Sequence, residues 1–399
     1  MRALKTLLTL SLLYSSIYAE EVKQLDLYIS KDKNKQFLYD YQKNDADGSK
    51  LRDSWISPLN LKYSHLKSNA NDTEVVSKTT SINMDQSIFR SGGIYYAIKY
   101  AEASLRYGNH SVDVIKQKLI KDAISLLMQI KQVDLKIQKQ NFLIANTEIN
   151  LKVKKEQYLN GQLDSNFLDT AIIERNSAIA SLYDIETSKE RLISSFETIS
   201  DLDYKNAKIP TLRDLTKDDF LNNNIILNMY ETQNNKNYHY KDMTVAKYLP
   251  SVNVIAGYNW NKLETKQLDT KDDYYNYGFK VTMPLDINTF KDIESSKVDY
   301  LKSQLNIKDK KRVMVSLYDQ VTQNISNFKK KIELSTQNKE IYQKLLVDTK
   351  KLYEVGYKTE YDVEVLSNSF EIQNLDIKVL EIDKQLELLS LYESYKRSE

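Results

Sequence analysis

The residue types that most often carry catalysis or bind transition metals are scarce in this chain. The three histidines, His65, His110 and His239, are scattered, and no pair has the spacing of a metal-binding helix. The sequence has no cysteine, which excludes cysteine nucleophiles, thiolate metal sites and structural disulfides. It also has no glycine-rich phosphate loop followed by Lys-Ser or Lys-Thr. We therefore predict that the chain is not an enzyme and that it holds no cofactor and no resident metal.

Charged residues are numerous but nearly balanced. The chain has 57 lysines and arginines against 55 aspartates and glutamates, a formal net charge of +2. A nucleic-acid-binding protein needs a basic excess to neutralise phosphates, so nucleic acid is not an expected partner. One group of carboxylates, Glu360, Asp362 and Glu364, falls at a predicted helix start shortly after Gly356. The helix dipole favours carboxylates there even if they serve no other purpose.

The first residues have the pattern of a secretory signal peptide. Arg2 and Lys5 precede a short apolar stretch over residues 7–13, and Ala19 is a small residue at a suitable cleavage point. The stretch is shorter than the roughly 20 residues that span a bilayer. We predict a signal peptide over residues 1–19, with a buried N-terminal helix as the alternative. No later segment has the length and apolarity of a transmembrane helix, so any membrane span must be made by strands.

An internal repeat organises the rest of the chain. Three landmarks recur in order at an offset close to 195 residues: Pro58 and Pro250, Ser87-Ile88-Phe89 and Met283-Pro284-Leu285, Tyr158-x-x-Gly161 and Tyr353-x-x-Gly356. Such order indicates a duplicated unit of short helix, two strands, long helix, glycine turn and helix. We place the first repeat at residues 20–205 and the second at residues 225–399. Residues 206–224 form an inter-repeat linker or an equatorial segment.

The strand segments alternate between apolar and polar residues. The apolar faces are Ile82, Met84 and Ile88 in the first half, and Val252, Val254, Ala256, Tyr258, Trp260, Tyr275, Tyr277, Phe279, Val281 and Met283 in the second. Alternation with aromatic residues on the apolar face is typical of transmembrane barrels, although a soluble sandwich also alternates. Four strands cannot close a barrel, and lipid does not tolerate open sheet edges. The strand count therefore predicts an oligomer, and three copies would supply 12 strands.

The helices make up most of the chain. Between Gly93 and about Leu159 there is no proline, and only Gly108 interrupts, which predicts a helix of about 100 Å. A 4-3 apolar spacing runs along it and recurs in the second half, and the return helix has a similar seam. The three seams are Leu119, Ala123, Leu126, Ile130, Val133 and Ile137; Val321, Ile325, Phe328, Ile332, Leu346 and Thr349; and Ile372, Leu375, Val379, Ile382, Leu386 and Leu389. Sustained heptads predict coiled-coil packing.

With these elements in order, the chain resembles the TolC family of outer-membrane efflux channel-tunnels. The resemblance covers nearly the whole mature sequence and rests on the duplicated order, the two Tyr-x-x-Gly turns, and the passage Ser87-Ile88-Phe89-Arg90-Ser91-Gly92-Gly93 from strand to long helix. It implies a mainly α fold with a small β part: a long coiled-coil helical barrel plus four strands per protomer. It also implies a homotrimer with a 12-stranded transmembrane β-barrel in the outer membrane of a Gram-negative bacterium and a tunnel through the periplasm.

The resemblance assigns functional roles to residues near the hairpin turns. Gly161 and Gly356 are the expected adaptor-docking turns, and Gly356 is expected to need a positive φ. Tyr353, Lys358, Asp362 and Glu364 are the expected periplasmic gate residues. Tyr353 matches the family's linking tyrosine, Lys358 replaces the usual arginine, and Asp362 matches the first of two gate aspartates. The sequence departs from the family at Phe167 and Val365, where aspartates are usual. In a trimer, Asp362 would form a ring that favours cations; the alternative is a solvated helix-start carboxylate.

These features predict a conduit that works with other proteins. We expect an outer-membrane channel of a tripartite efflux system, a passive exit duct for small molecules or drugs. The implied partners are a periplasmic adaptor protein, an inner-membrane RND or ABC transporter, and outer-membrane lipid. Type I protein secretion and metal-ion efflux share this kind of outer component and stay open. Outside this class, a secreted coiled-coil scaffold would explain the heptads and the signal peptide, but not the recurring strands.

Overall fold

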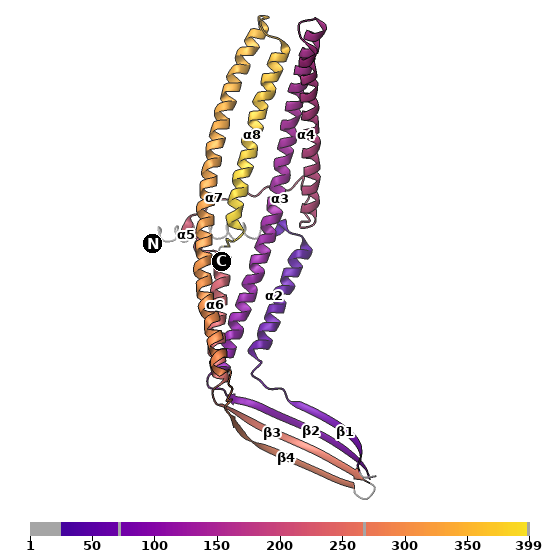
Figure 1. The fold of residues 1–399 in the computed structure, drawn as a ribbon, viewed down its shortest axis with the longest axis vertical. Helices are drawn as coiled ribbons and strands as arrows, with labels where there is room; N and C mark the ends of the chain where they lie inside the picture. The colour runs from indigo at the N-terminus through magenta and orange to yellow at the C-terminus, as the bar shows by residue number, and fades with distance from the viewer. Residues whose placement is uncertain (1–24, 71–72, 266–268, 397–399) are drawn as a thin grey trace, which may run out of the picture. The chain divides into compact units, whose positions relative to one another are not determined.

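The two halves of the chain have the same order of elements (Figure 1). The computed structural model describes residues 25–70, 73–265 and 269–396, so the predicted signal peptide lies outside the described residues. The first half contains η1 (Asp26–Tyr28), α2 (Lys31–Arg52), β1 (Asn60–Ala70), β2 (Thr73–Phe89), α3 (Gly93–Leu159) and α4 (Ser165–Glu197). After α5 (Lys217–Asn222), the second half contains α6 (Ile225–Lys247), β3 (Ser251–Thr265), β4 (Asp269–Thr282), α7 (Thr289–Glu354) and α8 (Glu360–Tyr392).

The chain divides into two compact units that do not coincide with the sequence repeats. One unit comprises Met1–Leu38, Asp113–Ile225 and Arg312–Glu399 and is built from helices. The other comprises Tyr39–Val112 and Ile226–Lys311 and contains the sheet. Each unit therefore takes segments from both halves, and the long helices α3 and α7 contribute residues to both. Among the described residues, no helix is long and apolar enough to cross a membrane.

The core of the helical unit lies around the middle of α3. Ala123, Ile130 and Val133 of the predicted seam are buried. A second apolar line on the same helix, which contains Ile124 and Leu127, is also buried. Two buried lines mean that α3 has a neighbouring helix on each side: Leu127 and Ile130 form a cluster with Ile193 and Phe196 of α4, and polar side chains join α3 to α8.

The helices α7 and α8 also bury residues of their predicted seams. On α7, Val321, Ile325 and Thr349 are buried, in agreement with the predicted seam. On α8, Ile372, Leu375 and Leu389 are buried as predicted. Lys339 of α7 donates to Asn374 of α8 at 3.0 Å, so α8 lies between α7 and α3. The helices of this unit are therefore ordered α7, α8, α3, α4, as Figure 1 shows.

The four strands form one antiparallel sheet in the order β1-β2-β3-β4. The cross-strand register puts the predicted apolar residues on a common face: Leu61, Ile82, Tyr258 and Tyr275 form one row across all four strands. The strict alternation of β2 ends at Ile88, which has no partner in the register. A β-bulge between Ser87 and Phe89 shifts the register, and Phe89 pairs with Val252 instead. An extra residue in one strand reverses the side of every residue after it, which a strict period of two does not reveal.

The opposite face of the sheet is polar and closely packed. Ser81 and Ser87 are buried, at 5% and 2% exposure. Gly257 lies between Asn83 and Asn276 on the adjacent strands, and a Cβ at this position would be 2.4 Å and 2.5 Å from their side-chain oxygens. A larger residue at this position would force the two flanking amides to move, so glycine allows their close approach.

The return helix of the first repeat ends well before Pro210, the proline of the inter-repeat segment. α4 ends at Glu197, and Thr198 is its C-cap. Pro210 lies in an irregular segment between α4 and the six-residue helix α5. The helix stops earlier because Ile199 and Ser200 donate their amides back to the Phe196 carbonyl, which closes the last turn.

Candidate functional site: hairpin turns, inter-repeat segment and exposed faces

The turns that connect α3 to α4 and α7 to α8 have the same backbone geometry. Gly161 and Gly356 have φ angles of +69° and +81°, which confirms the positive φ expected at Gly356. In the first turn, the Gly161 amide donates to the Tyr158 carbonyl at 3.0 Å and the Gln162 amide to the Gln157 carbonyl at 2.9 Å. The corresponding bonds in the second turn are Gly356 to Tyr353 at 3.0 Å and Tyr357 to Leu352 at 2.8 Å. Both are Schellman motifs, which close a helix with a left-handed residue.

Apolar side chains are exposed at both turns. Leu159 is 71% exposed, and Tyr158 is exposed beside it. In the second turn, Val355 and Tyr357 are 65% and 81% exposed. No atom lies within 4 Å of a Cβ built on either glycine. The two turns therefore present similar apolar tips, with space around the glycines for another protein to approach closely.

Asp362 closes the N-terminus of α8. Thr359 is the N-cap: its hydroxyl accepts a hydrogen bond from the Asp362 amide at 3.2 Å, and its own amide donates to Asp362 Oδ2 at 2.9 Å. This reciprocal pair is a capping box. Hydrogen bonds from the backbone and hydroxyl of Thr359, assisted by the charge of Lys358 at 3.8 Å, hold the pKa of the Asp362 carboxyl below its ordinary value. Within the protomer, Asp362 is thus a helix-capping carboxylate that stays ionised.

The other predicted gate residues are not brought together. Tyr353 is 45% exposed, and Glu364 is also exposed. Neither side chain forms a hydrogen bond or an ion pair with Lys358 or Asp362 in the described part of the protomer. Phe167 is 55% exposed on α4, with Lys154 Nζ 5.9 Å from its ring centroid. A gate that links Tyr353 to a neighbouring helix stays a prediction about an assembly of several copies.

A ladder of polar contacts that sequence reasoning missed joins α3 to α8. Its steps recur about every seven residues, in opposite directions on the two helices. They are Gln132 to Asp383 at 2.6 Å, Lys139 to Asp376 at 2.6 Å, Asn146 to Asn368 at 2.9 Å, and Lys152 to the Tyr361 ring at 4.9 Å. Because the two helices belong to different repeats, the ladder fixes the register of one hairpin against the other. The heptad spacing of these polar residues was the only signal in the sequence.

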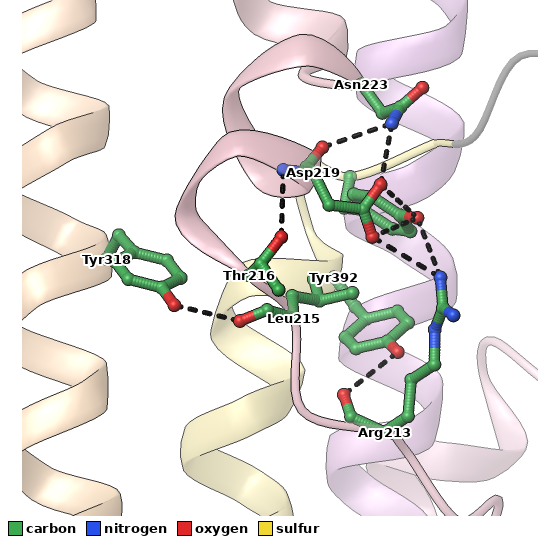
Figure 2. A network of polar contacts seen from close by, with 8 residues as sticks. Arg213, Leu215, Thr216, Asp219, Asn223, Tyr318 and Tyr392 are labelled. Atoms are coloured by element: carbon green, nitrogen blue, oxygen red, sulfur yellow. Dashed lines mark hydrogen bonds and ion pairs between the residues drawn. The ribbon is translucent and has the colours of Figure 1, made fainter.

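The inter-repeat segment is held against α7 and the end of α8 by the network in Figure 2. The Asp219 carboxylate accepts hydrogen bonds from Arg213 at 3.4 Å, Asn223 at 2.9 Å and Tyr395 at 3.2 Å. The Tyr392 hydroxyl donates to the Arg213 carbonyl at 3.2 Å, and burial raises the pKa of Tyr392. A charged acceptor with three donors is strongly fixed, so this segment is an ordered part of the helical unit.

The α7 side of the same segment is fixed by an aromatic contact and a hydrogen bond. Phe220 is fully buried and stacks on Tyr318 with a centroid separation of 5.9 Å. The Tyr318 hydroxyl donates to the Leu215 carbonyl at 2.9 Å (Figure 2). Together with the contacts to α8, this bond ties residues 213–223 to both helices of the second hairpin.

The chain is similar to known proteins in its structure but not detectably in its sequence. No protein-family model and no curated protein sequence matches the chain. Among solved structures, the outer membrane channel CmeC of Campylobacter jejuni superposes with a TM-score of 0.75 at 10% identity, over 95% of this chain and 87% of CmeC. VceC of Vibrio cholerae gives 0.73 at 14% identity, over 94% and 97%. CusC gives 0.70 at 14% identity, over 94% and 91%.

The chain has the TolC-type protomer fold. The resemblance stated from the sequence is therefore confirmed for the architecture: a mainly α chain with long paired helices and one four-stranded antiparallel sheet. The match covers 94–95% of this chain and 87–97% of the three channels. In the part of the chain that the structure describes, no three metal-binding side chains come together.

The TolC-type protomer leaves both outer faces of its helix layer exposed. On α7, Leu334, Ile341, Leu345 and Leu352 are between 42% and 58% exposed and recur at intervals of seven, four and seven residues. On α4, at the other end of the layer, Phe167, Ile173 and Tyr183 are more than half exposed. A heptad line of leucine and isoleucine is a seam for a partner helix.

The apolar face of the sheet is exposed as well. Tyr275, Tyr277 and Phe279 of β4 are 70%, 82% and 77% exposed, and Leu61 and Tyr63 of β1 are 72% and 66% exposed. β1 and β4 are the edge strands, each hydrogen-bonded on one side only. The TolC-type sheet thus has an apolar face and two open edges, neither of which is stable in water alone.

Proposed function

We propose that this chain is one protomer of a trimeric outer-membrane exit channel that works in a tripartite export system. The observation that carries the proposal is the sheet, which has an apolar aromatic face, a polar face and two unpaired edges. In lipid, every backbone donor and acceptor must be satisfied, so β4 of one copy must pair with β1 of the next until the sheet closes. Three copies supply 12 strands, within the range of bacterial barrels.

The helical layer supports the same assembly independently. Its two exposed apolar faces, on α7 and α4, lie at opposite ends of the α7-α8-α3-α4 order, so α7 of one copy can pack against α4 of the next. Such head-to-tail contacts generate a closed ring when the rotation between copies is regular. The sheet edges and the helix faces thus each require a neighbouring copy of the chain.

The likeness to CmeC, VceC and CusC supports a passive conduit in the outer membrane, with its helices in the periplasm. We propose that small molecules or drugs leave through it, driven by an inner-membrane RND or ABC transporter. The exposed apolar tips at Gly161 and Gly356 are the proposed docking surface for the periplasmic adaptor. Both tips have the same Schellman geometry, so one adaptor hairpin could recognise either tip by the same contacts.

Asp362 is the proposed selectivity residue at the periplasmic end. In a trimer it would place three carboxylates around one axis, and the capping box keeps each of them ionised. A ring of carboxylates favours cations. Because the pKa is lowered, we expect cation preference to persist through mildly acidic pH and to fade only as the pH drops below the ordinary aspartate range.

The assembly is tested first with the full chain expressed with its own leader. We expect the protein to be extracted only by detergent, as a heat-modifiable trimer that forms discrete conductances in planar bilayers. A soluble elongated dimer without conductance would contradict the proposal and favour the coiled-coil scaffold. Cells that lack the chain should also accumulate more of a fluorescent efflux dye than cells that carry it.

The selectivity of the same channel is tested with Asp362→Ala. We expect weaker cation preference in the reversal potential of a salt gradient, while Glu360→Ala, at the same helix start but outside the capping box, should change it less. Unchanged selectivity in Asp362→Ala would remove this residue from the conduction path.

A further inference from the structure

One row across the sheet consists entirely of basic residues. The register pairs His65 with Lys78, Lys78 with Lys262, and Lys262 with Lys271, so each of the four strands contributes one residue. These positions are an even number of residues from Leu61, Ile82, Tyr258 and Tyr275, so the row lies on the apolar face. We refer to His65, Lys78, Lys262 and Lys271 as the basic row.

The basic row lies just beyond the apolar band. On β3 the band runs from Val252 to Trp260, about 27 Å along the strand, which matches the apolar height of a barrel wall. Tyr63 and Trp260 belong to its last row, together with Thr80 and Asp273. Aromatic residues of this kind sit at the membrane-water interface. The basic row is two residues, or about 7 Å, further toward the hairpin turns.

The positive charge of the row is only partly compensated within the protomer. Lys78 and Lys262 share one carboxylate, Glu264, with Lys78 Nζ 3.1 Å from it, and Lys262 is 3.6 Å from Asp269. His65 and Lys271 are exposed and form no ion pair with described residues. The neighbouring charges belong to other contacts, since Asp273 accepts from Tyr258 at 2.8 Å and Lys67 pairs with Glu74 at 2.5 Å. Like charges directly opposite each other destabilise a sheet. A bound anion would offset the repulsion between the basic residues of this row.

We infer that the basic row binds the phosphate groups of anionic lipid in the outer leaflet of the outer membrane. This inference rests on the proposed function, which places the hairpin turns of the sheet toward the cell exterior. Adjacent strands are about 4.8 Å apart, so the ammonium groups of Lys262 and Lys271 can reach one phosphate together. Lysine is a compact charge that suits phosphate, and its stem can lie along the apolar band while its head stays polar.

No row on the opposite face of the sheet has more than one basic residue among the paired residues. The polar face has Lys62 in a row with Ser81, Asn259 and Tyr274, without a second basic residue. Lys62 is on β1 and is exposed. It is therefore a matched control: a lysine on the same sheet whose charge faces away from lipid.

The test uses the full-length trimer in detergent and measures equilibrium binding of diphosphoryl lipid A. The variant is Lys78→Gln/Lys262→Gln/Lys271→Gln with Glu264→Gln, which removes the three lysines of the row together with the carboxylate that two of them share. The net charge falls by two, and a lysine near a charged lipid surface contributes about fivefold in affinity, so we expect a loss of roughly 25-fold. Lys62→Gln should bind lipid A like the parent protein. Lipid A without its phosphates should bind the parent and the row variant equally weakly.

Three outcomes would overturn the inference. The row variant could retain the parent affinity for diphosphoryl lipid A, Lys62→Gln could lose as much as the row variant, or free inorganic phosphate could displace lipid A completely at millimolar concentration, which would indicate a general anion site. Conductance is measured on the same samples. Normal conductance with unchanged lipid A binding rejects the basic row alone, whereas absence of trimers and conductance in the parent protein rejects the proposed function itself.

Discussion

The two long helices of the duplicated chain, α3 and α7, meet their partners in different ways. α3 buries two apolar lines against α4 and α8 of the same chain, and Leu127, Met128 and Ile130 are fully buried there. α7 buries one line and leaves Leu345 and its heptad neighbours exposed. The two long helices thus have nearly equal lengths but different locations in the helix layer. α3 lies in the interior of the protomer, and α7 lies at its edge.

Truncation of the α3 core should have the largest effect on the protomer. Leu127→Ala removes a fully buried side chain from the cluster with Ile193 and Phe196. We expect a loss of about 3 kcal/mol in the free energy of unfolding, from lost burial and the cavity that remains. Urea denaturation of the helical signal measures it. A loss below about 1 kcal/mol would mean that α3 is not the interior helix.

The polar ladder should contribute less than the core but more than any surface contact. Gln132 is 7% exposed and donates to the Asp383 carboxylate at 2.6 Å. Gln132→Met keeps the size of the side chain but leaves the carboxylate without this donor, which should cost about 1–3 kcal/mol. Gln323→Met, on an exposed position of α7, is the control and should be close to neutral. Equal effects at the two positions would remove the distinction between the interior and edge helices.

The two hairpin turns have the same backbone geometry, so the same substitution in each turn should have the same effect on stability. Gly161→Val and Gly356→Val each force a β-branched residue into the left-handed region, at a cost of about 1–2 kcal/mol. We expect the same fall in the free energy of unfolding for both, because both turns are Schellman motifs. Export of an efflux dye should also be impaired by Gly356→Val. Normal export by that variant would show that the second turn tolerates a different backbone.

The edge of α7 should show the smallest effect on protomer stability and a separate effect on assembly. Leu345→Ala removes a half-exposed side chain, and we expect a change within about 0.5 kcal/mol in protomer unfolding. Trimers should nevertheless dissociate at a lower temperature in detergent, as measured by mass photometry. If Leu345→Ala destabilises the protomer as strongly as Leu127→Ala does, the exposed line on α7 is packed within the protomer. The distinction between an interior α3 and an edge α7 would then be wrong.

Much of the architecture was within reach of the sequence, because it depends on periodicity and chain order. The seams on α3, α7 and α8 follow heptads, the bounds of α3 follow from its uninterrupted composition, and the glycine turns follow from the need for positive φ. The apolar face of the sheet was predicted up to the bulge at Ile88. A bulge depends on local hydrogen bonding between strands that are far apart in sequence, and alternation alone does not encode it.

Less of the candidate site could be predicted from the sequence, because most of its contacts join segments that are far apart in the chain. The capping role of Asp362 follows from the local pattern Thr359-x-x-Asp362 and could have been recognised in the sequence. The α3–α8 ladder could not, since it depends on the register between helices of different repeats. The network of Arg213, Asp219 and Tyr395 depends on where an irregular segment docks, and no periodicity describes that. The resemblance to the TolC family assigned gate roles to Tyr353 and Glu364. Both side chains are exposed, and within the described residues neither is paired with Lys358 or Asp362, so these roles stay predictions.

The hydrogen bond between Asn224 and Ser394 limits how early in synthesis the helical unit can be completed. The two side chains are 170 residues apart in sequence, and the Ile225 amide also donates to the Ser394 carbonyl. Contacts between residues far apart in sequence slow folding, because the loop between them must be closed before the contact forms. The two repeats are already joined at the sheet, where β2 pairs with β3. A nascent chain that has emerged only as far as α7 can therefore form the sheet, but it still lacks the bonds of α8 and of Ser394 that complete the helical unit.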